Sequence, residues 1–243
     1  SGRRGANLFN WLRATFGLIL LVLLAACSAP KPAATVTPAV TLIPDVGYPP
    51  APPDVALGAV IFADRCTACH GERGLADGPL VRAQAVPAPP KLAARETGWT
   101  KTPAERFAFI AVGNMDKMMP PWNAALSEAE RWAVTLFTYT LHSAPEQLAR
   151  GRDLWAAACA ECHGAAGQGT PDVSTDLSDP RYMVGLSDER LYASLTAGLP
   201  DGTHVFTDLG EDALLALVAY TRSLSVTNAD AIGQPLAADA APD

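Results

Sequence analysis

Two copies of one pattern hold most of the chain's cysteines and half of its histidines. The first copy reads Cys-Thr-Ala-Cys-His from Cys66, and the second reads Cys-Ala-Glu-Cys-His from Cys159. The 243 residues include only five cysteines and four histidines. Thiol and imidazole groups at this spacing can form a redox disulfide, a zinc site or a covalent attachment point for a haem.

These three chemistries make different demands on the sequence. A redox Cys-x-x-Cys needs no following histidine and usually sits at a strand-to-helix turn, which neither copy shows. A zinc site needs four soft ligands, and beyond its own motif the first copy offers at best the distant His142. In a c-type haem site two thiols bond to the haem vinyl groups and the adjacent histidine binds iron. The sequence therefore predicts two covalently attached c-type haems, with attachment by Cys66, Cys69, Cys159 and Cys162 and iron ligation by His70 and His163.

The surrounding residues repeat as well, and they predict helices. Gly58 and Phe62 precede the first motif at the same offsets at which Gly151 and Trp155 precede the second. A second helix is expected at Thr102–Gly113 and at Ser187–Gly198, because each stretch opens with a capping residue and carries apolar side chains at helical spacing. A third helix is expected from Leu126 and from Leu209, with Phe137 opposite Tyr220. No stretch alternates like a strand, so the expected fold is all-α.

Both repeats resemble mono-haem class I cytochrome c domains. The resemblance covers about residues 53–225 and rests on the glycine-and-aromatic helix, the Cys-x-x-Cys-His-Gly motif and the final aromatic-bearing helix. It implies two tandem class I cytochrome c-like domains, each wrapped around a covalent haem. The predicted organisation is a signal and lipoprotein anchor segment (1–27), a Pro-rich tether (28–54), domain 1 (55–145), domain 2 (146–226) and a flexible tail (227–243).

The resemblance also implies ligands on the other side of each iron. In class I cytochromes the sixth ligand is usually a methionine followed by proline, and Met119 directly precedes Pro120. Met119 is therefore the expected sixth ligand of haem 1, with Met115 and Met118 as alternatives. The family also places a backbone carbonyl against the N–H of the proximal histidine, and residues 87–92 and 175–177 are the candidate regions.

Domain 2 departs from the family pattern at this position. Met119 stands six residues after Gly113, and six residues after Gly198 stands His204. We expect His204 to bind the second iron opposite His163, with Met183 or water as the alternative. The remaining histidine, His142, is interpreted as a surface residue.

The N-terminus has the features of an export signal. Arg3, Arg4 and Arg13 precede an uncharged run of 13 residues that ends at Cys27. This run is too short to cross about 30 Å of hydrocarbon but suits a signal peptide. Residues 24–27, Leu-Ala-Ala-Cys, resemble a lipoprotein signal, so Cys27 is the expected lipidation site, with an uncleaved anchor helix as the alternative. We expect a membrane-anchored protein outside the cytoplasm.

Charge and ligand type indicate the function. A formal charge of −7 without a Lys/Arg cluster argues against nucleic-acid binding and favours redox partners with a basic docking face. Thioether ligation raises a haem potential, so single electrons are expected to pass from haem 2 to haem 1, between respiratory or photosynthetic partners. The alternatives are a dihaem peroxidase or sulfur-compound dehydrogenase, for which no catalytic residue is assigned, and a fixed cytochrome subunit of a membrane oxidoreductase complex.

Overall fold

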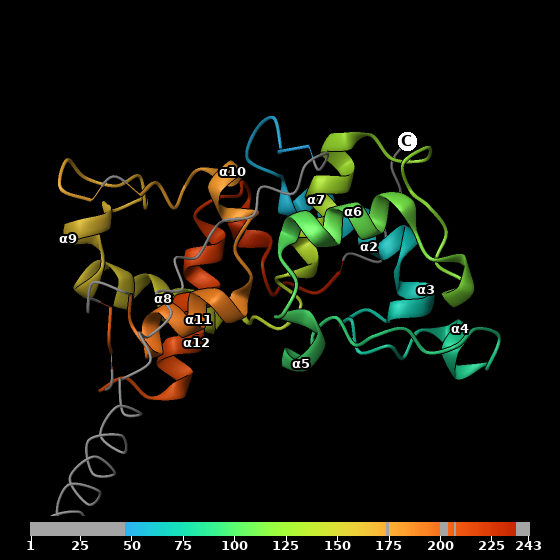
Figure 1. The fold of residues 1–243 in the computed structure, drawn as a ribbon. Coiled ribbons are helices and arrows are strands. Elements are labelled where there is room, and N and C mark those ends of the chain that lie inside the picture. The colour runs from blue at the N-terminus through green and yellow to red at the C-terminus, as the bar shows by residue number, and fades with distance from the viewer. Residues whose placement is uncertain (1–46, 174, 200–203, 207, 237–243) are drawn as a thin grey trace, which may run out of the picture. The chain divides into compact units, whose positions relative to one another are not determined.

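The structure is a computed structural model that describes residues 47–173, 175–199, 204–206 and 208–236. Within these residues all regular structure is helical and there is no strand, which confirms the all-α prediction. All of the described residues belong to one compact unit. Domain 1 contains α2 (Val55–Arg65), α3 (Thr67–His70), α4 (Pro79–Arg82), α5 (Arg95–Gly98), α6 (Pro103–Val112), η2 (Met115–Lys117) and α7 (Glu128–Thr138). Domain 2 contains α8 (Pro145–Ala158), α9 (Ala160–His163), α10 (Pro180–Met183), α11 (Asp188–Thr196) and α12 (Glu211–Ser223), and η3 (Ala229–Ala231) follows (Figure 1).

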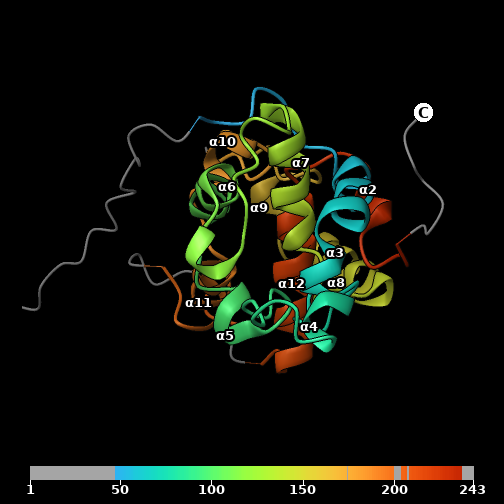
Figure 2. The same cartoon turned by 90° about the vertical axis from the view of Figure 1, so that its right-hand side faces the viewer.

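In each domain the first long helix crosses the last one at a glycine. A Cβ on Gly58 would lie 2.2 Å from a carbonyl oxygen of α7, and a Cβ on Gly151 would lie 2.1 Å from a carbonyl oxygen of α12. The added Cβ atoms would also lie 2.7 Å from the Cβ atoms of Phe137 and Tyr220, respectively. The predicted equivalence of these two aromatic residues is thereby confirmed. Figure 2 shows α2 beside α7 and α8 beside α12.

The second helix of each domain begins where the capping residues predict. At the start of α6 the Thr102 hydroxyl accepts from the Glu105 N–H, and the Glu105 carboxylate accepts from the Thr102 N–H at 2.8 Å. At the start of α11 the Ser187 hydroxyl accepts from the Arg190 N–H at 3.1 Å. Each cap satisfies helix N–H groups that lack a partner within the helix. The caps therefore fix the starts of the two helices that lead into the ligand loops.

The segment after α12 packs against domain 1, which differs from the flexible tail expected there. Thr227 pairs with Asp54 in an isolated parallel bridge. Ile232 is only 3% exposed and packs in a cluster with Val55, Phe107 and other residues of domain 1. Val226, Ala229 and Ala231 pack against the same cluster, and burial of these apolar side chains removes apolar surface from water. Residues 237–243 lie outside the described part of the chain.

The two domains contact each other through equivalent backbone groups. The Ala104 N–H donates to the Val184 carbonyl at 3.0 Å, and the Glu189 N–H donates to the Trp99 carbonyl at 3.2 Å. In the repeat alignment that pairs Thr102 with Ser187, these two hydrogen bonds are the same bond made in both directions. The contact is therefore quasi-symmetric, as in a two-fold dimer interface.

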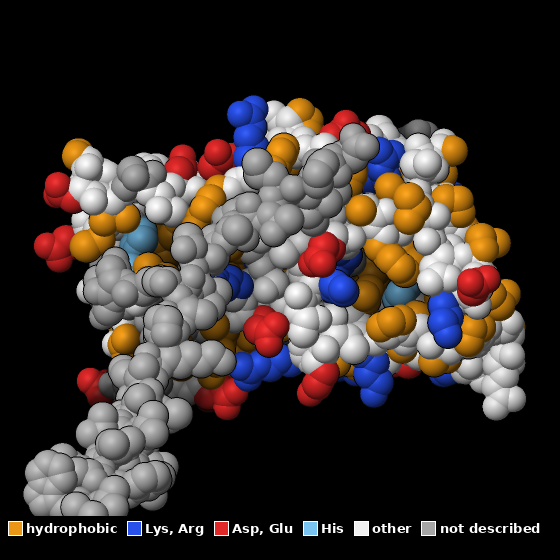
Figure 3. Space-filling view, in the orientation of Figure 1, with side chains coloured by type: hydrophobic (Ala, Val, Ile, Leu, Met, Phe, Trp, Pro, Cys, Tyr) orange, Lys and Arg blue, Asp and Glu red, His pale blue; other side chains and the backbone are white. Residues whose placement is uncertain are grey.

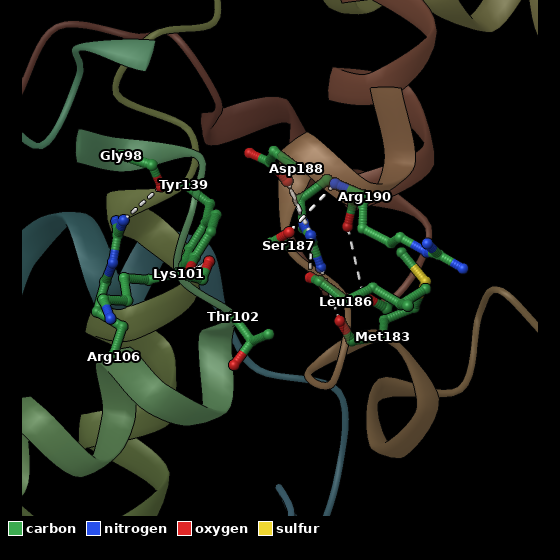
Figure 4. A network of polar contacts seen from close by, with 12 residues as sticks. Gly98, Lys101, Thr102, Arg106, Tyr139, Met183, Leu186, Ser187, Asp188 and Arg190 are labelled. Carbon is green, nitrogen blue, oxygen red and sulfur yellow. Dashed lines mark hydrogen bonds and ion pairs between the residues drawn. The ribbon is translucent and has the colours of Figure 1, made fainter. Parts of the chain in front are cut away.

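A buried polar network joins the two domains (Figure 4). Arg222 donates to the Asp188 carboxylate at 2.8 Å and to the carbonyl of Met183 at 2.8 Å. His142 lies against this pair, with its Nε2 3.6 Å from Asp188, and its ring centre lies 5.5 Å from that of Trp99. The side chain of His142 is only 14% exposed. The surface interpretation of His142 is therefore wrong, because the short connection between the domains folds it into their contact.

The proposed anchor falls outside the described residues, as do Cys27 and the arginines before it. Of the helices in the described ranges, none combines the length and apolar character needed to cross a membrane.

Candidate haem sites

Each Cys-x-x-Cys-His motif forms one short helical turn at the end of a long helix. Cys66 ends α2 and begins α3, and the N–H groups of Cys69 and His70 donate to its carbonyl at 3.2 and 2.9 Å. Cys159 makes the same two bonds, at 3.2 and 2.9 Å, to the N–H groups of Cys162 and His163. Residues three apart on one helical turn lie side by side, so both motifs present two thiols on one side.

The chain reverses immediately after each motif. Gly71 and Gly164 end the turn with φ of 76° and 79°, a conformation that favours glycine. An aromatic residue of the preceding helix lies near each histidine. The ring centres of Phe62 and His70 are 6.5 Å apart, and those of Trp155 and His163 are 5.8 Å apart. The two proximal half-sites are thus built alike.

The four motif cysteines are free thiols. Burial raises the pKa of Cys66 to about 12, with Cys69 and Asp64 adding to the shift. Burial raises the pKa of Cys159 to about 11, and Cys162 adds to it. In the described ranges no three His, Cys, Asp or Glu side chains gather as a metal site. Paired free thiols beside a histidine fit the covalent attachment of a haem.

The proximal histidines have buried nitrogens that point to the same chemistry. The Nδ1 atoms of His70 and His163 are buried and have no hydrogen-bond partner among the described residues. The predicted contact to a carbonyl of residues 87–92 or 175–177 is therefore not formed. Burial lowers the pKa of His70, and the charge of Arg106 adds to this effect. Burial also lowers the pKa of His163, and the neighbouring His204 adds to that shift. A lowered pKa keeps the imidazoles neutral, the form that binds iron.

Met119 is the methionine of its loop that faces the interior of domain 1. Its side chain packs against a core cluster that includes Phe62, and Cys66 packs against the same cluster. Met115 and Met118, in contrast, are 69% and 53% exposed. Two backbone hydrogen bonds to Asn114, at 2.7 and 2.9 Å, hold Met119 in an isolated bridge. The loop geometry therefore supports Met119 over the other two as the sixth ligand of haem 1.

His204 faces the proximal histidine of domain 2. Its Nε2 lies 3.1 Å from the Nε2 of His163, and the two ring centres are 5.4 Å apart. Imidazole nitrogens bind transition metals at about 2.0 Å, so two histidines on one metal hold their nitrogens about 4 Å apart. Separating the rings by about 1 Å would meet that requirement.

The backbone at His204 and the position of Met183 point to the same ligand. His204 has φ of 68°, an uncommon conformation outside glycine that is often retained at functional sites. Met183 is fully buried in a cluster with Trp99, Leu191 and Val218. Its side chain therefore packs at the contact between the domains rather than beside His163.

Each ligand loop is tied back to the helix before it. The Trp122 N–H donates to the Ile110 carbonyl at 3.2 Å, and the Phe206 N–H donates to the Leu195 carbonyl at 3.1 Å. Figure 3 shows histidine side chains at two separate places on one face, each bordered by hydrophobic side chains. At these two places, histidine and hydrophobic side chains are thus exposed together on the surface.

Sequence reasoning missed the charged groups between the domains. Arg106, Asp188 and Arg222 are 8%, 1% and 3% exposed. The repeat alignment could have indicated them, because each stands opposite an uncharged residue of the other domain. Arg106 aligns with Leu191, Asp188 with Pro103, and Arg222 with Tyr139.

The chain is similar to known cytochrome subunits. The family profile described as cytochrome c oxidase, cbb3-type, subunit III matches residues 53–137 and 146–220. The chain is 26% identical, over 58% of its length, to the Cbb3-type cytochrome c oxidase subunit FixP of Sinorhizobium medicae (strain WSM419), and covers 50% of it. It is 25% identical, over 70% of its length, to FixP of Rhizobium meliloti (strain 1021), and covers 60% of it. The chain thus spans about half the length of these relatives.

One solved structure gives a weaker similarity, a chain of the Kuenenia stuttgartiensis reducing HAO-like protein complex Kustc0457/Kustc0458. That chain has a TM-score of 0.30 and 23% identity, and the match covers 69% of this chain and 95% of the other.

Two separate family matches, each containing one Cys-x-x-Cys-His motif, correspond to the two tandem domains of the structure. Two covalent c-type haems and a role in electron transfer follow from them. This protein belongs to the cytochrome c oxidase, cbb3-type, subunit III family and is a dihaem class I-type cytochrome c.

Proposed function

We propose that this chain is a membrane-tethered electron-transfer module that passes single electrons from haem 2 to haem 1. Haem iron, when bound, supplies one-electron chemistry by alternating between the ferric and ferrous states. Cys66 and Cys69 attach haem 1, which His70 and Met119 ligate; Cys159 and Cys162 attach haem 2, which His163 and His204 ligate. The observation that carries this proposal is that the Nε2 atoms of His163 and His204 lie 3.1 Å apart. In domain 1 the position equivalent to His204 is occupied by Met119, which packs against the core.

Different sixth ligands give the two sites different potentials. A thioether sulfur stabilises ferrous iron and raises the potential compared with a second imidazole. With protein ligands on both sides, each iron would have no open position for a substrate, which suits outer-sphere electron transfer. This arrangement supports a carrier over a peroxidase or a dehydrogenase, which need an open or displaceable coordination position.

The charge distribution indicates where an electron donor docks. Domain 1 (55–145) carries nine basic and eight acidic residues, for a net charge of +1, whereas domain 2 (146–226) carries five basic and twelve acidic residues, for a net charge of −7. A protein with a basic docking face is therefore steered to domain 2, beside haem 2. A haem held there by Cys159, Cys162, His163 and His204 would accept the one electron that such a donor gives up.

The names of the relatives favour a fixed subunit over a free carrier, because both are called subunits of a Cbb3-type cytochrome c oxidase. In this form haem 1 hands its electron to the oxidase. The anchor proposed at residues 1–27, lipidated at Cys27, would hold both domains at the outer face of the cell membrane. Co-purification from native membranes with an oxidase would support the fixed subunit, and recovery of the chain alone would support the carrier.

Spectroscopy of the haem-loaded protein tests the ligand assignment. The oxidised protein should show two low-spin haems by EPR, one of methionine–histidine type and one of bis-histidine type. Potentiometric titration should give the lower potential to the bis-histidine haem. Two identical haems, a high-spin haem or the reverse order of potentials would contradict the proposal.

Ionic-strength dependence tests the docking assignment. Glu161→Gln and Asp172→Asn remove exposed charges of domain 2, and Glu72→Gln is the matched change in domain 1. Reduction of the protein by a small basic one-electron carrier should slow with added salt and with the domain 2 changes, but not with the control. Equal effects in the two domains would contradict docking at domain 2.

A further inference from the structure

Arg106 is a buried arginine whose recorded contacts are all neutral. It lies on α6, is 8% exposed and donates from Nη1 to the Thr138 hydroxyl at 2.8 Å. Its Nη2 donates to the Gly98 carbonyl at 2.6 Å, and its guanidinium carbon lies 4.1 Å from the centre of the Tyr139 ring (Figure 4). These contacts satisfy hydrogen bonds and leave the charge in place.

Arg222, another buried arginine of the same region, is paired with a carboxylate. Arg222 is 3% exposed and its guanidinium lies 2.8 Å from the Asp188 carboxylate. Among the described residues Arg106 has no carboxylate within 4.0 Å. Burying a charge without an opposite charge is costly, so such groups are rare unless they serve a nearby negative or redox-active group.

The fold itself does not require an arginine at this position. In the alignment that pairs Thr102 with Ser187, the equivalent of Arg106 is Leu191. Leu191 is buried to a similar degree, at 7% exposed, within the corresponding helix α11. The positive charge is therefore a property of domain 1 alone.

A chain of contacts connects Arg106 to the core around the attachment site of haem 1. Gly98, which accepts its hydrogen bond, abuts the backbone of Leu92, since a Cβ on Gly98 would lie 2.2 Å from the Leu92 oxygen. Leu92 packs against the core cluster that Cys66 and Met119 also contact.

We propose that the buried positive charge of Arg106 raises the reduction potential of haem 1. An oxidised haem carries one more positive charge than a reduced haem, so a nearby fixed cation disfavours the oxidised form. The interior is less polarisable than water, which strengthens the effect. Leu191 supplies no such charge in domain 2. The ligand difference and the charge difference therefore act in the same direction.

The inference rests on the proposed haem sites, and a pair of substitutions tests it. Arg106→Lys keeps the charge and Arg106→Gln removes it, while both side chains can donate to the Gly98 carbonyl. In the haem-loaded full chain, followed by EPR and optical potentiometry, Arg106→Gln should shift the midpoint potential of haem 1 downward. Arg106→Lys should keep it near the wild-type value, and haem 2 should not move in either variant.

Arg95→Gln is the matched control. Arg95 is another arginine of domain 1, but its side chain is 45% exposed and paired with Glu211 at 2.7 Å. Solvent and its partner screen this charge, so neither haem should shift.

Three results would overturn the inference: equal shifts in the Lys and Gln variants, a shift at haem 2 alone, or no shift at either haem. Equal shifts would assign Arg106 a hydrogen-bonding role instead. Failure of the ligand assignment is recognised separately, because it appears as two identical haems in the wild-type EPR spectrum. The Lys and Gln variants can still be compared in that case.

Discussion

Tyr139 and Arg222 occupy equivalent positions in the last helices of the two domains, and they meet at the domain contact. The guanidinium carbon of Arg222 lies 5.2 Å from the centre of the Tyr139 ring. The same ring receives Arg106 at 4.1 Å, and its hydroxyl donates to the Lys101 carbonyl at 2.6 Å. A quasi-symmetric contact therefore carries an asymmetric set of charges, since the tyrosine of one domain faces the arginine of the other.

Breaking the buried pair of Arg222 and Asp188 should destabilise the protein strongly. Both side chains are nearly inaccessible, at 4% and 1% exposed, so Asp188→Asn leaves a buried guanidinium without its counter-charge. We expect a loss of about 3–5 kcal/mol in the free energy of unfolding, measured by urea denaturation of the haem-loaded protein. The control Glu211→Gln breaks the exposed pair with Arg95 and should cost less than about 1 kcal/mol. Similar losses in both variants would refute this reading of the contact.

His142 should make stability depend on pH. Burial lowers its pKa, with Arg106 and Arg222 contributing in the same direction and Asp188 opposing them. Its folded-state pKa is thus below the unfolded value of about 6.5, so the unfolded chain binds more protons as the pH falls through that value. Stability should therefore be greatest above pH 6.5 and should decrease below it.

The comparison with His142→Gln isolates this effect from the carboxylates that titrate in the same range. The difference in unfolding free energy between wild type and variant should change between about pH 7 and pH 5. A difference that is constant with pH would show that His142 does not titrate in this way.

Much of the fold was predictable because the sequence contains two copies of the same pattern. The equal offsets of Gly58 and Gly151 from the motifs, and the capping residues Thr102 and Ser187, located helices that the structure confirms. Local chemistry decides these features, so a single sequence carries them. The contact between the domains was not predictable in detail, because it depends on which faces of the two folded repeats meet. His142 illustrates this, since its immediate neighbours along the chain do not reveal Asp188 or Trp99 beside it.

The ligand sites were predictable to different degrees for the same reason. Equal spacing after Gly113 and Gly198 predicted Met119 and His204 as ligands. The structure packs Met119 against the core of domain 1 and places His204 opposite His163, and their ligation of iron stays a prediction. The role proposed for Arg106 had no local signature, because its lack of a counter-charge appears only when the surroundings are assembled.

Adding one methyl group at the helix crossings should destabilise each domain. Gly58→Ala and Gly151→Ala place a Cβ within 2.2 and 2.1 Å of backbone carbonyl oxygens, which cannot rotate away. We expect losses of about 1–3 kcal/mol in unfolding free energy, together with poorer haem retention in the altered domain. Gly210→Ala is the control, because a Cβ there meets nothing within 4 Å, so only a small change in helix capping is expected. Thermal unfolding with separate optical readout of the two haems distinguishes the domains.

Removing His204, the proposed sixth ligand of haem 2, should change the spin state of this haem while leaving haem 1 unaltered. His204→Ala deletes the imidazole that faces His163 at 3.1 Å, so one coordination position loses its protein ligand and the haem should become high-spin. Met183→Leu removes the alternative ligand, a thioether, with little change of side-chain volume. Because Met183 is fully buried against Trp99 and Leu191, we expect no spectral change in this variant. EPR of the oxidised proteins measures both outcomes. A low-spin haem 2 in His204→Ala, combined with a high-spin haem 2 in Met183→Leu, would assign Met183 as the ligand. Both haems would then have a thioether ligand, and the argument that haem 2 has the lower potential would be lost.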